Sequence, residues 1–174
     1  MNHAQIVEHL PGLRRYARAL TGDAWAADDL VQDTLERACR KWPLWRHGSN
    51  LRAWLFTLMH NLYLNQRRAL LPVQALDDEA LASVAGAADV AADTGLDLDR
   101  CLQRLPAEQR AVLLLVTLED MAYADVARVL GVPLGTVMSR LSRARERMRA
   151  LMEQTPTRAP QRPTHPNTAL RRLK

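Results

Sequence analysis

The segment from Tyr123 to Arg147 constrains the fold of this chain more than any other part of the sequence. It begins with a short amphipathic pattern, passes through the turn residues Gly131-Val132-Pro133, and continues as a longer pattern that is rich in arginine. Two helices joined by such a turn form a helix-turn-helix, whose second helix enters the major groove of DNA. The segment therefore predicts a helical domain and a duplex DNA ligand.

The second helix of this segment separates apolar from polar residues when its positions are projected at about 100° per residue. Small polar side chains beside arginine suit base edges and phosphates, and arginine pairs with guanine through two hydrogen bonds. A solvated basic face is the alternative interpretation, but the preceding turn and short helix favour DNA binding. The apolar face holds Val137, Leu141, Ala144, Met148 and Leu151, and the opposite face holds Thr136, Ser139 and Arg143, flanked by Arg140 and Arg147.

Helical periodicity extends over nearly the whole chain, and glycine is scarce, so the sequence predicts an all-α fold. Residues 112–116 are apolar on all sides and should therefore lie at the centre of a core. The expected helices outside the helix-turn-helix cover residues 4–20, with a break or kink at Pro11-Gly12, and residues 26–41, 51–68, 96–105 and 107–118.

Composition divides the chain into two small helical domains joined by a flexible acidic linker. From Ala69 to Asp99 there is no lysine or arginine but there are seven carboxylates. The linker lacks bulky core residues, although a transient helix near Asp77–Val84 is possible, and fully extended it spans about 85 Å. The predicted parts are a domain at 1–69, the linker at 70–95, a helix-turn-helix domain at 96–154 and a disordered basic tail at 155–174.

The charge and the absence of catalytic motifs exclude several classes of function. A net charge of +5 with a pI near 9.9 fits a polyanionic partner. There is no signal peptide and no 18-residue apolar stretch, so we expect a cytoplasmic protein without membrane insertion. Cys39 and Cys101 lack metal-ligand spacing and are expected to be buried, reduced thiols. We expect no metal, no cofactor and no enzymatic activity, because no catalytic motif is present.

The predicted helix at 26–41 carries a polar strip opposite its apolar face. Carboxylates dominate this strip, which would orient a basic helical partner and speed its encounter. A solvated helix face is the alternative interpretation. The strip consists of Asp29, Gln32, Asp33 and Glu36.

The predicted helix at 51–68 carries a strip of aromatic, amide and guanidinium side chains. Such groups suit single-stranded nucleic acid, because they stack on bases, bond to base edges and pair with phosphates. The strip comprises Trp54, Asn61, Asn65 and Arg68, and the preceding loop adds Ser49 and Asn50, which could line a pocket for an extruded base. Alternatively, Trp54 is a core residue and the asparagines are only solvated.

Together these segments resemble the extracytoplasmic-function (ECF, group 4) σ factors of bacterial RNA polymerase. Residues 10–23 and 27–38 resemble the family's region 2, and residues 51–68 resemble its −10-reading helix. Residues 105–110 and the helix-turn-helix resemble region 4. The resemblance covers residues 4–153 in the family's order, and its region 2 part discriminates best, because many regulators carry a similar helix-turn-helix.

The resemblance implies an alternative σ factor that directs core RNA polymerase to specific promoters, and it assigns roles to the residues above. Asp29, Gln32, Asp33 and Glu36 would bind core polymerase at the β′ clamp helices, and the β flap would be a further contact. Ser49, Asn50, Trp54, Asn61, Asn65 and Arg68 would hold the melted −10 strand. Thr136, Ser139, Arg140, Arg143 and Arg147 would read the −35 duplex. The acidic linker would enter the RNA exit path, and an anti-σ factor is an expected partner.

The chain departs from the family at two places. Met138 stands where the family usually has lysine or arginine, so one phosphate contact is in doubt. The basic tail is not a fixed part of the family. Two alternatives stay open: a dimeric helix-turn-helix regulator that acts without polymerase, and an RNA-binding helical protein that uses the tail. The first needs an apolar dimer surface, and residues 26–68 offer no spare apolar stripe.

Overall fold

The structure of the chain is a computed structural model that describes residues 3–45, 48–70 and 94–154. These residues contain helices and no strand, which confirms the all-α prediction. The predicted linker, including Asp77–Val84, and the tail lie almost entirely outside the described residues. The elements are α1 (His3–Val7), α2 (Leu10–Thr21), α3 (Ala24–Lys41), the 3-10 helix η1 (Trp42–Leu44), α4 (Leu51–Leu70), α5 (Thr94–Gln103), α6 (Ala107–Thr117), α7 (Tyr123–Leu130) and α8 (Leu134–Gln154).

Short polar residues and glycines set the ends of the main helices. Asp23 begins α3 by accepting the N–H of Ala26 at 2.8 Å, and Asn50 begins α4 by accepting the N–H of Ala53 at 3.0 Å. Both are N-cap hydrogen bonds, which satisfy donors that have no partner within the helix. Gly131 ends α7 in the left-handed conformation with φ 65°, which only glycine adopts without steric cost. This turn places α8 directly after α7 and confirms the predicted helix-turn-helix.

The predicted break in the first helical stretch was placed wrongly at Pro11-Gly12. The chain leaves the helical conformation after Val7 and re-enters it at Leu10, so Pro11 lies in the first turn of α2. Proline is tolerated in a first turn, because its missing N–H would have no helical partner there. Pro11 therefore marks the start of α2 instead of interrupting a longer helix.

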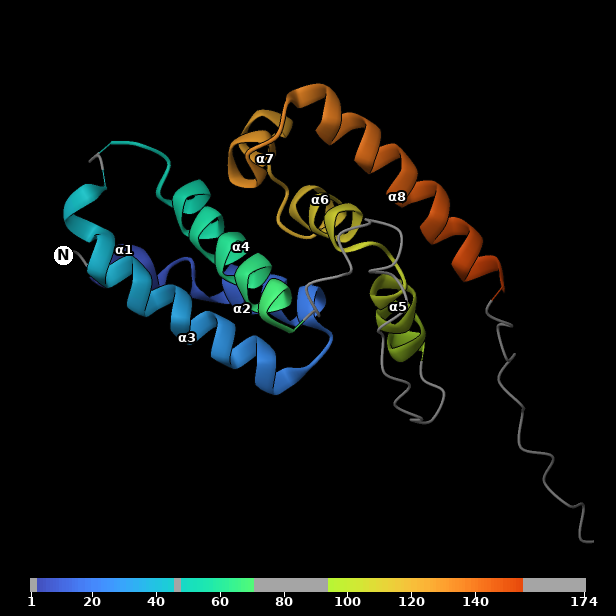
Figure 1. Cartoon of the computed structure of the whole chain (residues 1–174), viewed down its shortest axis with the longest axis horizontal. Coiled ribbons are helices and arrows are strands. Elements are labelled where there is room, and N and C mark those ends of the chain that lie inside the picture. The colour runs from blue at the N-terminus through green and yellow to red at the C-terminus, as the bar shows by residue number, and fades with distance from the viewer. Residues whose placement is uncertain (1–2, 46–47, 71–93, 155–174) are drawn as a thin grey trace, which may run out of the picture.

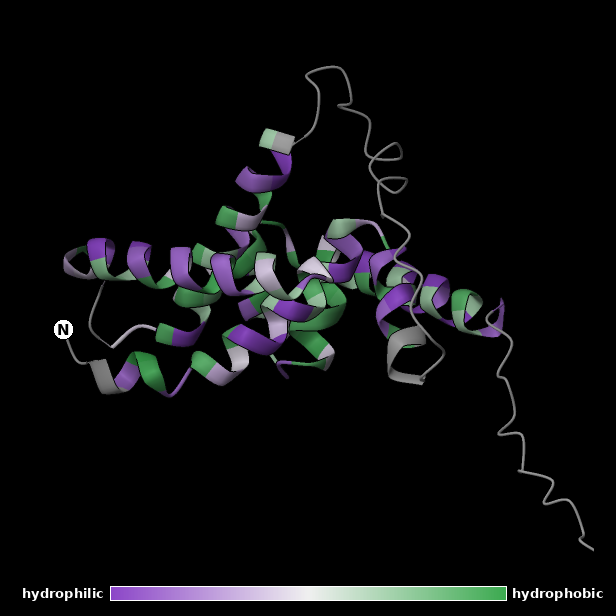
Figure 2. Cartoon of the chain, turned by 90° about the horizontal axis from the view of Figure 1, so that it is seen from below, coloured by the Kyte–Doolittle hydropathy of each residue, from purple (hydrophilic) through white to green (hydrophobic). Residues whose placement is uncertain are grey.

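The two groups of helices pack on each other as well as within themselves. Helices α2, α3 and α4 pack together, and so do α6, α7 and α8, while α4 also contacts α7 and α2 contacts α5 and α6 (Figure 1). The helices turn hydrophobic residues inward and hydrophilic residues outward (Figure 2). Tyr16 and Phe56 meet edge to face in the core, with ring centroids 5.3 Å apart. One continuous cluster of buried residues thus includes both groups of helices.

One of the two cysteines departs from the prediction. Cys101 is buried, but Cys39 is exposed on α3. The inward residues of α3 include Thr34 and Ala38, and Cys39 lies about 100° further round the helix than Ala38. The apolar neighbourhood in the sequence was therefore misleading, because it did not fix the face on which Cys39 lies.

Candidate nucleic-acid and polymerase interfaces

The acidic strip on α3 is only partly free to meet a partner. Asp29, Gln32 and Glu36 are exposed, and the Gln32 amide donates to Glu36 Oε1 at 3.3 Å. Asp33 is half-buried and accepts a hydrogen bond from Gln66 of α4 at 3.1 Å. Asp33 therefore helps to join α3 to α4, which leaves Asp29 and Glu36 as the carboxylates of the strip that are most available to a partner.

A surface groove runs beside this strip between α2 and α3. It combines cationic, acidic and apolar side chains, and this mixture suits an amphipathic helix better than a small molecule. Cys39 lies in the wall of the groove, which accounts for its exposure. The groove is lined by Arg14, Arg18, Asp28, Val31, Gln32, Leu35, Glu36, Cys39 and Arg40.

Most side chains of the predicted strip on α4 are exposed, and Trp54 is the exception. Asn61, Asn65 and Arg68 are exposed on one face, as their spacing predicts. Ser49 and Asn50 are also exposed, and Asn50 caps α4. The structure thus presents these amide and guanidinium groups to solvent in the second half of α4, away from the N-terminal end that Asn50 caps.

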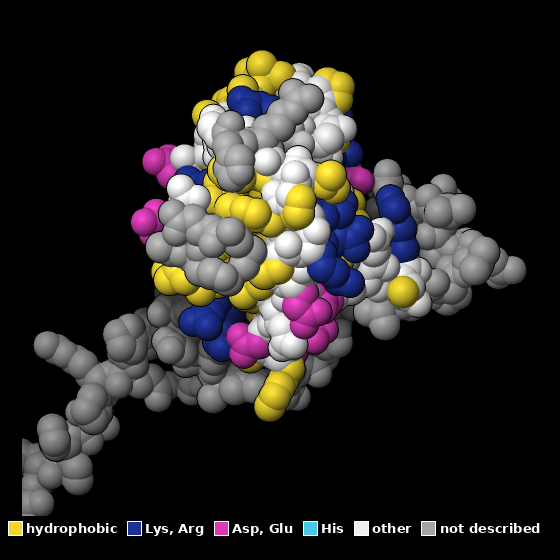
Figure 3. Space-filling view, turned by 90° about the vertical axis from the view of Figure 1, so that its left-hand side faces the viewer, with side chains coloured by type: hydrophobic (Ala, Val, Ile, Leu, Met, Phe, Trp, Pro, Cys, Tyr) yellow, Lys and Arg dark blue, Asp and Glu magenta, His cyan; other side chains and the backbone are white. Residues whose placement is uncertain are grey.

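Trp54 is half-buried and belongs to an aromatic cluster. Its ring centroid lies 6.3 Å from that of Trp42 and 6.4 Å from that of Trp45. Hydrophobic side chains gather on the face of the molecule that lies at the left of Figure 1 (Figure 3). Trp54 thus has part of the structural role that was the alternative interpretation, although it is only half-buried.

The α8 face predicted to read the −35 element is mostly open. The five predicted core residues of α8 are all buried. Ser139, Arg143 and Arg147 are exposed, and Thr136 is half-buried. Arg140 is also half-buried and forms an ion pair with Glu108 of α6. Arg140 is therefore turned toward α6 in this structure. Arg143, one turn further along α8, is exposed to solvent.

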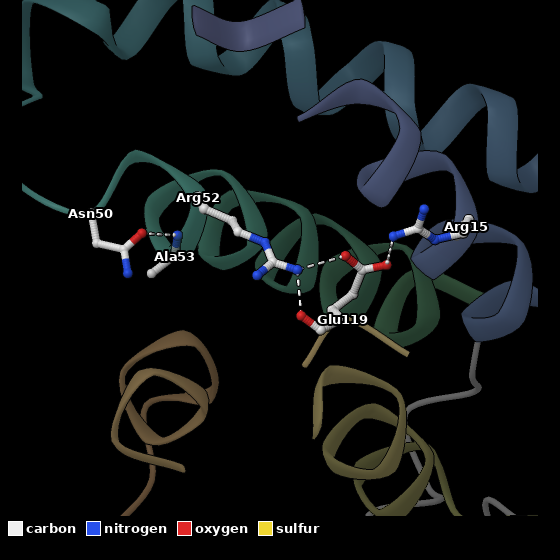
Figure 4. A network of polar contacts seen from close by, with 5 residues as sticks. All are labelled: Arg15, Asn50, Arg52, Ala53 and Glu119. Carbon is white, nitrogen blue, oxygen red and sulfur yellow. Dashed lines mark hydrogen bonds and ion pairs between the residues drawn. The ribbon is translucent and has the colours of Figure 1, made fainter. Parts of the chain in front are cut away.

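A buried carboxylate that sequence patterns did not identify joins the two groups of helices. Glu119, in the loop between α6 and α7, has a side chain that is only 1% exposed. Arg15 of α2 donates to its Oε1 at 3.2 Å, and Arg52 of α4 donates to its Oε2 at 2.9 Å and also to its backbone carbonyl (Figure 4). Burial of a carboxylate is favourable only with such partners, so Glu119 depends on both arginines.

Further polar contacts cross the same boundary. Arg110 of α6 is buried and donates from Nη2 to the Tyr63 hydroxyl of α4 at 2.9 Å. Gln103 of α5 donates to the backbone carbonyl of Ala19 of α2 at 3.0 Å. Interfaces within a chain that are rich in polar contacts resemble transient protein interfaces, for which relative motion is the default expectation. In this chain the polar contacts accompany the continuous buried cluster that joins the two groups of helices.

His60 is a buried histidine on the side of α4 that faces the C-terminal helices. Its exposure is 5%, and among the described residues its Nδ1 has no hydrogen-bond partner. Burial, and then the nearby Arg140 charge, lower the pKa of His60 to about 4. The folded chain therefore holds this imidazole in its neutral form at pH 7.

This lowered pKa predicts a loss of stability in acid. The unfolded chain binds a proton to His60 near its ordinary pKa of 6.5, whereas the folded chain resists protonation until about pH 4. His60 should therefore cost about 2 kcal/mol of unfolding free energy between pH 7 and pH 5. Urea unfolding of wild type and His60→Gln at both pH values measures this. The wild type should lose more stability than the variant, and equal losses would contradict the assignment.

The described residues offer no group of His, Cys, Asp and Glu side chains arranged to hold a metal ion. Nor does any helix among them combine the length and apolarity that a membrane span needs. The acidic strip, the α4 strip and the arginine face of α8 are the candidate surfaces that the sequence predicts in this part of the chain.

Comparisons with protein families assign each group of helices separately. Residues 6–60 match the family of the Sigma2 domain of PhyR, and residues 95–148 match Sigma-70, region 4. The chain is 37% identical over 149 residues to the ECF RNA polymerase sigma factor EcfG of Rhodopseudomonas palustris, covering 84% of this chain and 82% of that protein. It is also 37% identical over 148 residues to SigM of Mycobacterium tuberculosis, covering 83% and 73% of the two chains.

Solved structures with a similar arrangement of helices include two protein complexes. The sigma factor RpoE, in complex with the anti-sigma factor NepR from Bartonella quintana, is similar with a TM-score of 0.71 and 31% identity, over 88% of this chain and 97% of that one. CnrH, in complex with the cytosolic domain of CnrY, is similar with a TM-score of 0.66 and 25% identity, over 87% and 86%.

Proposed function

Because the chain belongs to the ECF σ factors of bacterial RNA polymerase, we propose that its three exposed surfaces divide the work of promoter recognition. The chain directs core polymerase to specific promoters. In the proposal, α3 docks on the polymerase, α4 holds the melted −10 strand, and α8 reads the −35 duplex. The observation that supports this best is the presence in one chain of an exposed acidic strip on α3 and an exposed arginine face on α8. A simple operator-binding protein needs only the second of these.

The partners follow from this division. Core RNA polymerase meets the chain at the β′ clamp helices and the β flap, and promoter DNA is the second partner. The similar proteins RpoE and CnrH have each been seen with a protein bound, and for RpoE that protein is an anti-sigma factor. We therefore infer that an anti-σ factor also regulates this chain. The chain has no catalytic step of its own in this scheme, because the polymerase carries out the chemistry.

Co-purification with core RNA polymerase tests the proposal directly. We expect the full chain to be retained by core enzyme and to confer binding to a subset of promoter fragments. A dimeric helix-turn-helix regulator would bind a palindromic duplex without core enzyme, and an RNA-binding protein would be retained by RNA instead. The proposal would be contradicted if the chain bound neither core enzyme alone nor promoter DNA in the presence of core enzyme.

Arg143 should set upstream specificity, because it is exposed in the middle of the outward face of α8. Arg143→Ala should lose about 1–3 kcal/mol of promoter affinity if Arg143 pairs bidentately with guanine. The loss should be confined to promoters with that base, as measured by competition between promoter variants with holoenzyme. A loss shared equally by all sequences would instead indicate a phosphate contact.

Met138 gives a second test of the same face. Met138 is 54% exposed and lies one turn after Leu134. At position 138 the family usually has a cation. Met138→Lys should tighten promoter binding and steepen its dependence on salt, because one more phosphate would release its counterion. An unchanged slope of affinity against salt would show that position 138 does not face DNA.

A further inference from the structure

We propose that Trp25 is an apolar anchor with which α3 holds core RNA polymerase, and that it extends the docking surface one turn beyond the acidic strip. The partner that fits this surface is a helix with an apolar side chain beside basic ones. The inference rests on the proposed function for the identity of the partner as polymerase. The anchor itself stands on the exposure of Trp25 and on its position around α3.

Trp25 is the most exposed large hydrophobic residue that the structure describes. It is 86% exposed in the first turn of α3, whereas the other three tryptophans of the chain lie against one another near the start of α4. Single apolar residues are ordinary on a protein surface, but an aromatic side chain presents about 150–250 Å² for burial. Folding covers little of this area at Trp25, so it is left for a partner to bury.

Trp25 points in the same direction as the exposed part of the acidic strip. At about 100° per residue, Asp29, Gln32 and Glu36 lie within about 40° of Trp25 around the helix axis. All three are exposed. Asp33, which accepts a hydrogen bond from α4, lies about 80° away. Trp25 therefore continues the strip toward the N-terminal end of α3, and the row from Trp25 to Glu36 is about 17 Å long.

Hydrogen bonds hold the turn that carries Trp25. The side chain of Asp23, the N-cap of α3, accepts the N–H of Ala26 at 2.8 Å. The N–H of Asp23 in turn donates to the Thr21 hydroxyl at 3.3 Å. A helix end that is fixed in this way loses little conformational freedom on binding, so less of the gain from burial is offset. The anchor is thus preorganised for a partner.

The charges around Trp25 favour a protein partner over a nucleic acid. An exposed tryptophan also stacks on unpaired bases in proteins that bind single strands. Here, however, Asp28, Asp29 and Glu36 are exposed on the same side of α3 and would repel the phosphates of a strand. An aromatic residue among carboxylates instead matches an apolar side chain that is flanked by lysine or arginine.

The groove between α2 and α3 borders this row. Gln32 and Glu36 belong to both the acidic strip and the wall of the groove, and Leu35 adds an apolar side chain. Arg14 and Arg18 line the groove from α2 and suit carboxylates on the partner. A helix that lies along α3 would therefore bury the tryptophan and the apolar part of the groove together.

The anchor and the acidic strip predict different effects on the kinetics of binding. Exposed carboxylates act at a distance, so they mainly raise the association rate, and salt screens them. A buried aromatic anchor acts only in contact, so its loss mainly raises the dissociation rate at any salt concentration. The contribution of Trp25 is therefore separable from that of the strip, although both serve one partner.

The test measures association and dissociation of the full chain on immobilised core polymerase at low and high salt. Trp25→Ala should dissociate about tenfold faster than wild type at both salt concentrations, with an association rate within about twofold of wild type. Trp25→Phe should keep most of the affinity, because an aromatic ring remains. Leu44→Ala is the matched control. Leu44 is 79% exposed just beyond the other end of α3, so its truncation should match wild type.

Equal dissociation of Trp25→Ala and wild type would overturn the anchor, as would an equal loss in Leu44→Ala. A lowered melting temperature, with Trp25→Phe as weak as Trp25→Ala, would show that Trp25 has a structural role instead. Weaker binding of Trp25→Ala to a labelled oligothymidylate, with core binding unchanged, would indicate base stacking. Failure of the wild type itself to bind core polymerase would overturn the proposed function, and this outcome is distinguishable from the others because they all require a wild type that binds.

Discussion

Reversal of Asp29 and Glu36 to lysine is expected to weaken binding to core RNA polymerase by about thirtyfold, or roughly 2 kcal/mol. Both carboxylates are exposed on the outward side of α3. A basic helical partner would then meet two like charges in place of two opposite ones, which slows encounter and penalises the bound state. Titration of labelled core enzyme with each variant measures the effect, and it should diminish at high salt.

The choice of residues separates docking from folding. Asp33 is left intact, because its hydrogen bond from Gln66 joins α3 to α4 and a lysine there would disturb packing. Glu8→Lys with Asp99→Lys is the matched control, since both residues are exposed and the charge change is identical. The melting temperature of each variant should stay near wild type. Equal binding by the reversed strip and the control would show that polymerase docks elsewhere.

Asn61→Ala is expected to reduce open-complex formation on duplex promoters about tenfold, which is the order of one lost base contact. Asn61 is exposed on α4, on the same face as Asn65 and Arg68. A base reaches such groups only after it leaves the stack, which costs a few kcal/mol. The variant should therefore bind duplex promoters initially as wild type does, through the −35 contacts, and fail at the melting step.

Two templates distinguish this role from a general loss of affinity. On a promoter with a pre-melted −10 bubble the defect should shrink in part, because the unpairing cost is removed while the base contact stays lost. Permanganate footprinting with holoenzyme reports unpaired thymines on both templates. Normal thymine reactivity on the duplex promoter with Asn61→Ala would reject the assignment of Asn61 to the melted strand.

Local patterns in the sequence were enough to predict the helices and their inward faces. The five apolar positions of α8 recur at helical spacing, and all five are buried as predicted. Gly131 and Pro133 marked the turn of the helix-turn-helix. Glycine suits the left-handed conformation that ends α7, and proline suits the start of the next helix, α8. The family's order of segments then predicted the function, which the comparisons confirm.

Contacts between distant residues could not be predicted in this way. Glu119 pairs with Arg15, 104 positions away, and with Arg52, 67 positions away, and no periodicity relates such residues. The sequence suggested two domains joined by a linker, and it offered no sign that α4 would pack on α7. Cys39 was misplaced for a related reason: a helix face is decided by the neighbours that cover it, and these come from elsewhere in the chain.

The distribution of tryptophan gives this protein two separate optical reporters. Of its four tryptophans, Trp25 is 86% exposed in the first turn of α3, one turn before Asp29. The other three, Trp42, Trp45 and Trp54, lie together beside the N-terminal end of α4. Emission from Trp25 should therefore respond when a protein covers the acidic strip, and emission from the cluster should respond when a strand reaches α4. With Trp25→Phe and Trp54→Phe to assign the signals, intrinsic fluorescence can order the two events in time without any attached label.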